Sequence, residues 1–179
     1  MLASNQSAED SAGLTRREER GVLVVTCLAA FLFFNSFGSI SVALPIIQRQ
    51  FGSSLAEIQW ISLMGVVTIS SLSLCFGRAG DLLGRRRIYK IGVSLYTLGS
   101  GLGSLSTSFS QLLSSRGVMA VGLAMALPMS AAILASSFDP NRRGQALGLF
   151  AAAIAVGRAA GPTIGGFLLH LWGWPLFLR

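Results

Sequence analysis

Residues 117–138 read GVMAVGLAMALPMSAAILASSF, a run of 22 residues without a charged side chain. The hydrocarbon core of a bilayer is about 30 Å thick, and about 20 apolar residues cross it as an α-helix. Every peptide group inside that core must be hydrogen-bonded within the protein, which a helix achieves by itself. The run therefore predicts a transmembrane helix.

Four further runs with no charge, or with a single one, share the character of this stretch. Together the five runs predict an all-α membrane protein with transmembrane helices near residues 21–46, 57–78, 88–106, 110–136 and 145–171. Residues 1–20 are polar and predict a short solvated tail ahead of a helical domain over residues 21–179. The first apolar run is too long for the core of a signal peptide.

Composition and charge placement agree with this prediction. Hydrophobic residues make up 52% of the 179 residues and charged residues 12%, against about 25% charged in soluble domains. These values exclude a soluble globule and a disordered chain. The net charge of +7 reflects topology rather than nucleic-acid binding, because ten basic residues fall in the tail and in alternate loops, against Arg49 alone in the others. This distribution predicts a multi-pass protein of the plasma (cytoplasmic) membrane with a cytoplasmic N-terminus.

Enzyme chemistry finds little support. His170 is the only histidine, and with Cys27 and Cys75 it does not make a typical zinc site. The sequence contains no P-loop, dinucleotide fingerprint or nucleophile elbow. We therefore expect a protein that is not an enzyme, with no catalytic residue, no metal and no cofactor.

The loop between the second and third predicted helices carries an unusual pattern, G-x-x-x-D-x-x-G-R-R-R. Topology explains its arginines but not the spacing of its acid and glycines. The residues of the pattern are Gly77, Asp81, Gly84, Arg85, Arg86 and Arg87. The pattern resembles the loop 2–3 signature of the major facilitator superfamily, G-x-L-A-D-x-x-G-R-R. Ala79 and Gly80 stand where Leu and Ala are usual. The resemblance implies a gating role for this loop.

The fifth predicted helix gives a second, independent match. Its residues fit G-x8-G-x3-G-P-x2-G-G without a gap: Gly148, Gly157, Gly161, Pro162, Gly165 and Gly166. Glycines four residues apart line one helix face, and small residues let membrane helices approach closely. A generic packing seam is the alternative interpretation. The full spacing resembles the antiporter motif of the drug:proton antiporter branches of the same superfamily, where it is held to control closure of the pathway.

Two arginines lie within predicted helices, where a charge is costly. Arg116, followed by Gly122, resembles the family's span 4 motif R-x-x-x-G-x-G, whose arginine is linked to proton coupling; Ala120 replaces the first glycine. The alternative for Arg116 is that it reaches the outer interface. Arg158 lies midway along the fifth helix. It is either an anion-contacting residue of the transport cavity or the partner of a carbonyl or of an acid on another helix.

The first predicted helix ends in V-A-L-P at residues 42–45, which resembles the family's D-x-T-I-V-N-V-A-L-P. Ser36 stands at the position of the acid, which is a candidate proton carrier in many drug antiporters. A proton-carrying carboxylate would therefore have to come from elsewhere. In the loop after the fourth helix, Asp139 is a further acid, and we expect it either to pair with one of the arginines at 85–87 or to be solvated.

The resemblance implies part of a larger transporter. The family has twelve or fourteen spans in two six-helix halves. With V-A-L-P and Ile58-Gln59-Trp60, the chain resembles most of the N-terminal half in the fourteen-span type. The expected function is proton-coupled efflux of small organic compounds by alternating access, with the proton gradient as energy source. Expected partners are the lipid bilayer, a small-molecule substrate and further C-terminal helices.

Two alternatives stay open for the function. One is a carrier of the same superfamily for sugars, organic acids or other metabolites, and the other is a naturally short, non-transporting membrane partner. In either the exporter or the carrier case, we expect that residues 1–179 do not transport alone, because the substrate site of the family lies between two halves.

Overall fold

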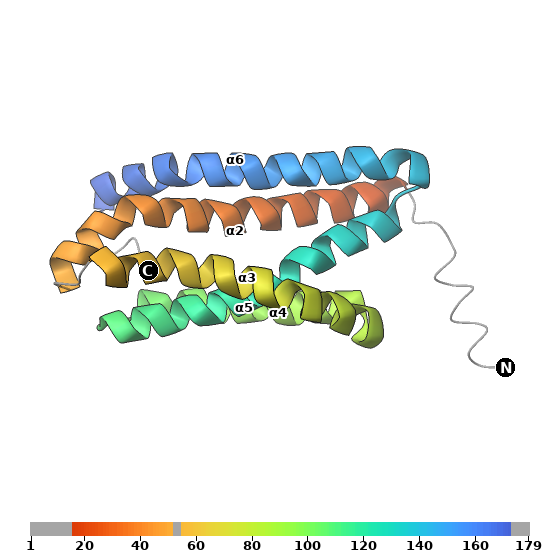
Figure 1. Cartoon of the computed structure of the whole chain (residues 1–179). Helices are drawn as coiled ribbons and strands as arrows, with labels where there is room; N and C mark the ends of the chain where they lie inside the picture. The colour runs from red at the N-terminus through yellow and green to blue at the C-terminus, as the bar shows by residue number, and fades with distance from the viewer. Residues whose placement is uncertain (1–15, 52–54, 173–179) are drawn as a thin grey trace.

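The computed structural model describes the backbone of residues 16–51 and 55–172, and side chains at 16–39, 59, 60 and 63–167 (Figure 1). The described backbone forms five helices: α2 (Arg16–Phe51), α3 (Leu55–Leu83), α4 (Arg85–Ser104), α5 (Phe109–Ser137) and α6 (Pro140–Trp172). No strand occurs within these ranges. The predicted fold class, an all-α membrane protein with five helices, is confirmed.

The helices differ in how well they suit a bilayer. Four contain segments long and apolar enough to cross one, at Arg16–Ser39, Leu63–Leu83, Phe109–Ser137 and Pro140–Phe167. The remaining helix, α4, has 20 residues and starts with the three arginines of the loop motif. The first helix begins at Arg16, inside the segment for which the sequence predicts a tail. Residues 1–15 and 173–179 lie outside the described residues.

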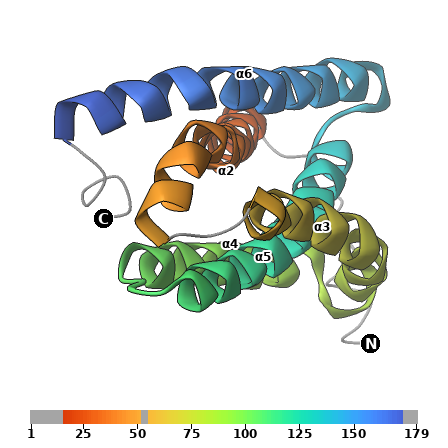
Figure 2. The same ribbon diagram turned by 60° about the vertical axis from the view of Figure 1, so that its left-hand side comes forward.

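The helices form two layers. Figures 1 and 2 show α2 and α6 side by side in one layer and α3, α4 and α5 together in the other. Contacts within each layer are far more extensive than contacts between the layers. The helices α2 and α6 run parallel, because Gly157 meets Phe31 and Gly165 meets Ser39. The helices α4 and α5 run antiparallel.

Glycines bring α4 and α5 into backbone contact. A Cβ added at Gly92 would lie 2.7 Å from the carbonyl oxygen of Gly122, and one added at Gly122 would lie 2.6 Å from that of Gly92. Further along, a Cβ at Gly99 would lie 2.9 Å from the backbone nitrogen of Met119. These helices can approach so closely only because the side chains are absent.

An apolar cluster joins the layers at the turn between α5 and α6. Ala30 of α2 packs there with Leu134, Phe138, Ala146 and Phe150, all of which are buried. Other large apolar side chains cover the outside of the bundle, and several are more than half exposed: Val24, Leu28, Val66, Leu98 and Val156. A water-soluble protein seldom exposes so much apolar surface. Such a surface suits lipid chains or neighbouring helices.

The contact between α4 and α5 generates a stability prediction. We expect Gly122→Ala to lower the free energy of unfolding by about 1–3 kcal/mol, because the new methyl group overlaps the backbone of α4. Gly117→Ala on the same helix is the control, since its Cβ would meet only the Met64 side chain, with the sulfur at 3.7 Å. Reversible unfolding in mixed micelles, followed by circular dichroism, measures both. Equal stabilities would contradict the proposed close contact.

Candidate functional site

The loop motif forms a one-residue turn between α3 and α4. Gly84 adopts a φ of 97°, a conformation that residues with a side chain rarely adopt. Its backbone N–H donates to the carbonyl of Gly80 at 3.0 Å and so ends α3. This conformation explains why the motif needs a glycine at this point.

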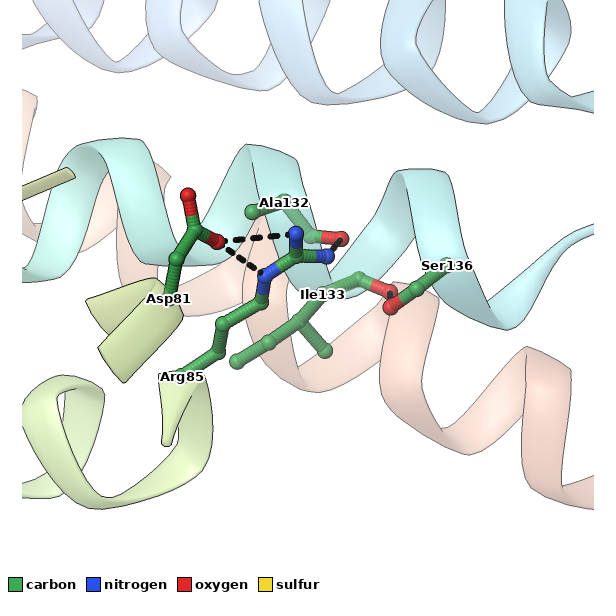
Figure 3. Close-up of polar contacts among 5 residues, drawn as sticks. All are labelled: Asp81, Arg85, Ala132, Ile133 and Ser136. Carbon is green, nitrogen blue, oxygen red and sulfur yellow. Dashed lines mark hydrogen bonds and ion pairs between the residues drawn. The ribbon is translucent and has the colours of Figure 1, made fainter. Parts of the chain in front are cut away.

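The acid and the first arginine of the motif pair across this turn. Arg85 donates from Nε and Nη2 to Oδ1 of Asp81 at 3.0 and 2.9 Å, and from Nη1 to the carbonyl of Ala132 at 3.4 Å (Figure 3). The same view shows the Ser136 hydroxyl donating to the carbonyl of Ile133 in α5. Arg85 therefore links the α3–α4 turn to α5.

The other motif residues remain apart from this contact. Arg86 and Arg87 are exposed, and the described residues offer their side chains no ion pair or hydrogen bond. A Cβ at Gly77 would meet nothing within 4 Å. Gly80, in contrast, leaves space for a side chain of α5, because a Cβ there would overlap the sulfur of Met129. The sequence gives no signal for this Gly80–Met129 contact, which crosses between two helices.

The glycine face of α6 packs on α2 in four-residue steps. Added Cβ atoms would lie 2.5 Å from the Phe31 carbonyl oxygen at Gly157 and 2.6 Å from the Asn35 carbonyl oxygen at Gly161. At Gly165 a Cβ would lie 2.7 Å from Cβ of Ser39. These three glycines therefore form one continuous seam along α2, as glycines on one face of a helix allow.

A serine hydroxyl strengthens this α2–α6 seam. Ser39 Oγ lies 2.8 Å from two carbonyl oxygens, those of Gly161 in α6 and Asn35 in its own helix, and its single proton is shared between them. The helix continues through Pro162, and a Cβ at Gly38 would lie 3.2 Å from the Pro162 ring. The sequence pattern does not reveal Ser39 as a partner of the glycine face.

Two other glycines of the same pattern behave differently. Gly148 has open space around its missing Cβ, and Gly166 is half-buried. Within the antiporter-type pattern, the glycines at 157, 161 and 165 thus pack on α2, whereas the first glycine, Gly148, packs on no described residue. Control of a transport pathway by these residues stays a prediction.

Arg116 lines a small cavity where four helices meet. Phe37 of α2, Gly65 of α3 and Tyr96 of α4 face it, together with Met119, Ala120 and Leu123 of α5. Its volume is about 20 Å³, which is room for about one water molecule. The Nε atom of Arg116 is buried and has no hydrogen-bond partner. An arginine held in this way can bind an anionic group.

The walls of this cavity are themselves fixed by packing. The Phe37 ring occupies the space that a side chain at position 65 would need, since a Cβ at Gly65 would lie 2.6 Å from it. Tyr96 packs on Phe33 with ring centroids 4.4 Å apart and donates to the Phe33 carbonyl at 3.4 Å. Gly122, which the sequence associates with Arg116, lies instead in the α4–α5 contact.

Arg158 lies away from this cavity. Its side chain is exposed, and no described residue forms an ion pair or hydrogen bond with it. Its carbonyl oxygen faces α2, where a Cβ at Gly38 would come within 2.6 Å. The proposed role of Arg158 as an anion contact therefore gains no support from the described neighbours, and it stays a prediction.

A second ion pair joins helix ends that the sequence does not connect. Arg142 donates from Nη1 to Oε2 of Glu19 at 3.2 Å, and the Glu19 side chain is only 12% exposed. Asp139 does not brace the arginines at 85–87, contrary to one of the two expectations for it, because Arg85 pairs with Asp81. The carbonyl of Asp139 accepts the backbone N–H groups of Arg142 and Arg143 and so starts α6.

Comparison with known proteins identifies relatives of most of the described bundle. The sequence model of the family called Major Facilitator Superfamily matches residues 26–178. The riboflavin transporter RibZ of Clostridioides difficile is 33% identical over 86% of this chain and 34% of its own length. The multidrug resistance protein Stp of Mycobacterium tuberculosis (strain CDC 1551 / Oshkosh) is 35% identical over 85% of this chain and 28% of its own length.

A solved structure extends the likeness to three dimensions. The bacterial homologue of the human lysosomal transporter Spinster, in an inward-facing and unoccupied conformation, superimposes with a TM-score of 0.78 at 25% identity. The match covers 88% of this chain and 33% of that one. The chain thus spans about a third of the length of these relatives.

The two ion pairs allow a comparative prediction. We expect Glu19→Gln to lower the free energy of unfolding by about 1.5 kcal/mol, because it removes the charge from a largely buried partner of Arg142. Asp81→Asn is the matched variant and should cost less than about 0.5 kcal/mol, since both members of its pair are well exposed. Chemical unfolding in detergent micelles gives both values. A larger loss at Asp81 would refute this ranking.

Proposed function

The chain belongs to the major facilitator superfamily, and we propose that it is the N-terminal part of a secondary transporter that exports small organic compounds. The relative named as a multidrug resistance protein supports the substrate class. In this proposal the chain supplies one side of a pathway, and alternating access moves the substrate across the membrane.

The observation that carries this proposal is the α2–α6 seam. The glycines at 157, 161 and 165 have the spacing of the antiporter-type pattern, and all three contact α2 closely. Close packing of this kind makes α2 and α6 one rigid pair, which fits a transporter whose helices move in groups. The pattern thus has a structural role that depends on its glycines.

A metabolite carrier is the second candidate. The relative named as a riboflavin transporter favours it, since its match covers about the same share of this chain as that of the drug-related relative. Both candidates share the fold and the membrane location. Substrate profiling in a strain without its own efflux pumps separates them.

The proposal also includes coupling of export to protons, which requires a carboxylate that carries the proton. The acids with described side chains lie at helix ends: Glu18, Glu19, Asp81 and Asp139. The described parts of the helix interiors therefore hold no carboxylate that would carry a proton. In a proton-driven exporter, this group would come from residues outside the described set.

The proposed orientation places the basic helix ends in the cytoplasm. Figure 1 shows the start of α2, the α3–α4 turn and the α5–α6 turn at the same end of the bundle. These three segments hold most of the basic residues of the chain, among them Arg16, Arg86 and Arg143. Basic residues near the ends of membrane helices favour the cytoplasmic side.

Drug accumulation tests the export function. The gene that encodes these residues is expressed in a strain without its own efflux pumps. From a panel of cationic, neutral and anionic fluorescent drugs, we expect the accumulation of at least one to fall severalfold and to recover with a protonophore. Gly161→Ala should abolish most of this export, because its methyl group overlaps α2. Gly148→Ala, which meets open space, is the control. Unchanged accumulation with the unaltered gene would reject the exporter.

Cysteine labelling tests the orientation. In a variant that lacks Cys27 and Cys75, Arg86→Cys should react with a membrane-impermeant maleimide only after the cells are opened. Ser110→Cys, at the opposite end of the bundle in the first turn of α5, should react in intact cells. Both side chains are exposed in the structure. The reverse pattern would invert the proposed topology.

A further inference from the structure

The charge of Arg116 is uncompensated among the described residues. Its Nε is buried without an acceptor, and it takes part in neither of the ion pairs described above. The position lies seven residues into α5, or about 10 Å along the helix. A cation held in an apolar bundle needs a counter-charge or a strong acceptor.

Acids of the described part of the chain are too far away to supply it. Asp139 follows Arg116 by 23 residues, which is about 35 Å along the α5 direction. Glu19 and Asp81 lie at the same end of the bundle as Asp139 (Figure 1). An extended arginine side chain does not span such a distance, so these carboxylates cannot neutralise Arg116.

The surroundings of Arg116 suit a flat anionic group. Phe37 and Tyr96 supply aromatic walls, and Leu123 and Met119 supply apolar ones. The Ser36 side chain lies within hydrogen-bonding reach of Tyr96, so position 36 adds a neutral hydroxyl beside the cavity. A guanidinium binds carboxylates through two parallel hydrogen bonds, and such charge-assisted bonds are strong in apolar surroundings.

We propose that Arg116 binds the carboxylate of the transported compound, so that the substrates of this protein are apolar or aromatic organic anions. The inference rests on the proposed transport function and names its substrate class. The cavity has room for about one water-sized group. It therefore admits one oxygen of the carboxylate, while the apolar body of the compound lies outside it.

Binding of a small aromatic carboxylate tests this proposal. The probe is 4-fluorobenzoate, titrated by fluorine NMR against the purified chain in nanodiscs of phosphatidylcholine, with neutral 4-fluorobenzamide as the matched ligand. We expect saturable binding of the benzoate and much weaker binding of the amide. Arg116→Gln should weaken benzoate binding about tenfold or more. Arg116→Lys should keep part of it, because the charge stays and the planar fork is lost.

Two further variants distinguish binding at Arg116 from nonspecific attraction to cations and from loss of the fold. Arg78→Gln removes an exposed arginine of α3 and should leave benzoate binding unchanged. An equal loss there would mean nonspecific attraction and would overturn the proposal. Ser36→Asp keeps Arg116 and places a carboxylate beside Tyr96, so it should compete with benzoate and weaken binding as well. This variant keeps the test valid if Arg116→Gln fails to fold.

A last variant tests whether the carboxylate that neutralises Arg116 belongs to the protein itself rather than to a substrate. Glu57 precedes Gly65 by eight residues on α3. If Glu57→Gln creates benzoate binding that the unaltered chain lacks, Glu57 already neutralises Arg116 and the proposal is wrong. Absent benzoate binding together with export of a drug from the panel would refute the substrate class and leave the transport function standing. Binding without any export would instead reject the transport function.

Discussion

Backbone contact between helices is the interaction on which this structure depends. In a bilayer, apolar side chains gain little by leaving lipid for protein, so helices associate through close packing and hydrogen bonds. The chain meets this condition twice, at Gly157, Gly161 and Gly165 against α2, and at Gly92 and Gly122 between α4 and α5. In both places the missing side chains let one backbone lie against another.

These two seams explain the layered arrangement. The α2–α6 seam joins helices that are distant in sequence and parallel, whereas the α4–α5 seam joins sequence neighbours that are antiparallel. Between the layers the contacts are fewer, and they involve side chains, such as Phe33 on Tyr96. Each layer is therefore held more tightly within itself than against the other layer.

The sequence predicts the helices and the faces of contact, but not which helices meet. Run length alone gives the five helices, because hydrocarbon thickness dictates how many apolar residues a helix needs. The four-residue glycine spacing likewise gives the contact face of α6. Its partner could not be derived, because the pattern of one helix contains no information on the neighbour, and Ser39 shows no signal of its own. For the same reason the Glu19–Arg142 pair and the Gly80–Met129 contact appear only in the structure.

The position of the Arg116 cavity connects packing with function. One of its walls, Phe37, belongs to the α2–α6 layer, while its other lining residues come from α3, α4 and α5. A shift of one layer against the other therefore changes the distance between Phe37 and Arg116 without breaking either glycine seam. The Phe37 ring lies against Gly65 of α3, where an added Cβ would come within 2.6 Å of it. The cation thus lies in a cavity whose walls come from both layers, so its surroundings depend on how the two layers pack against each other.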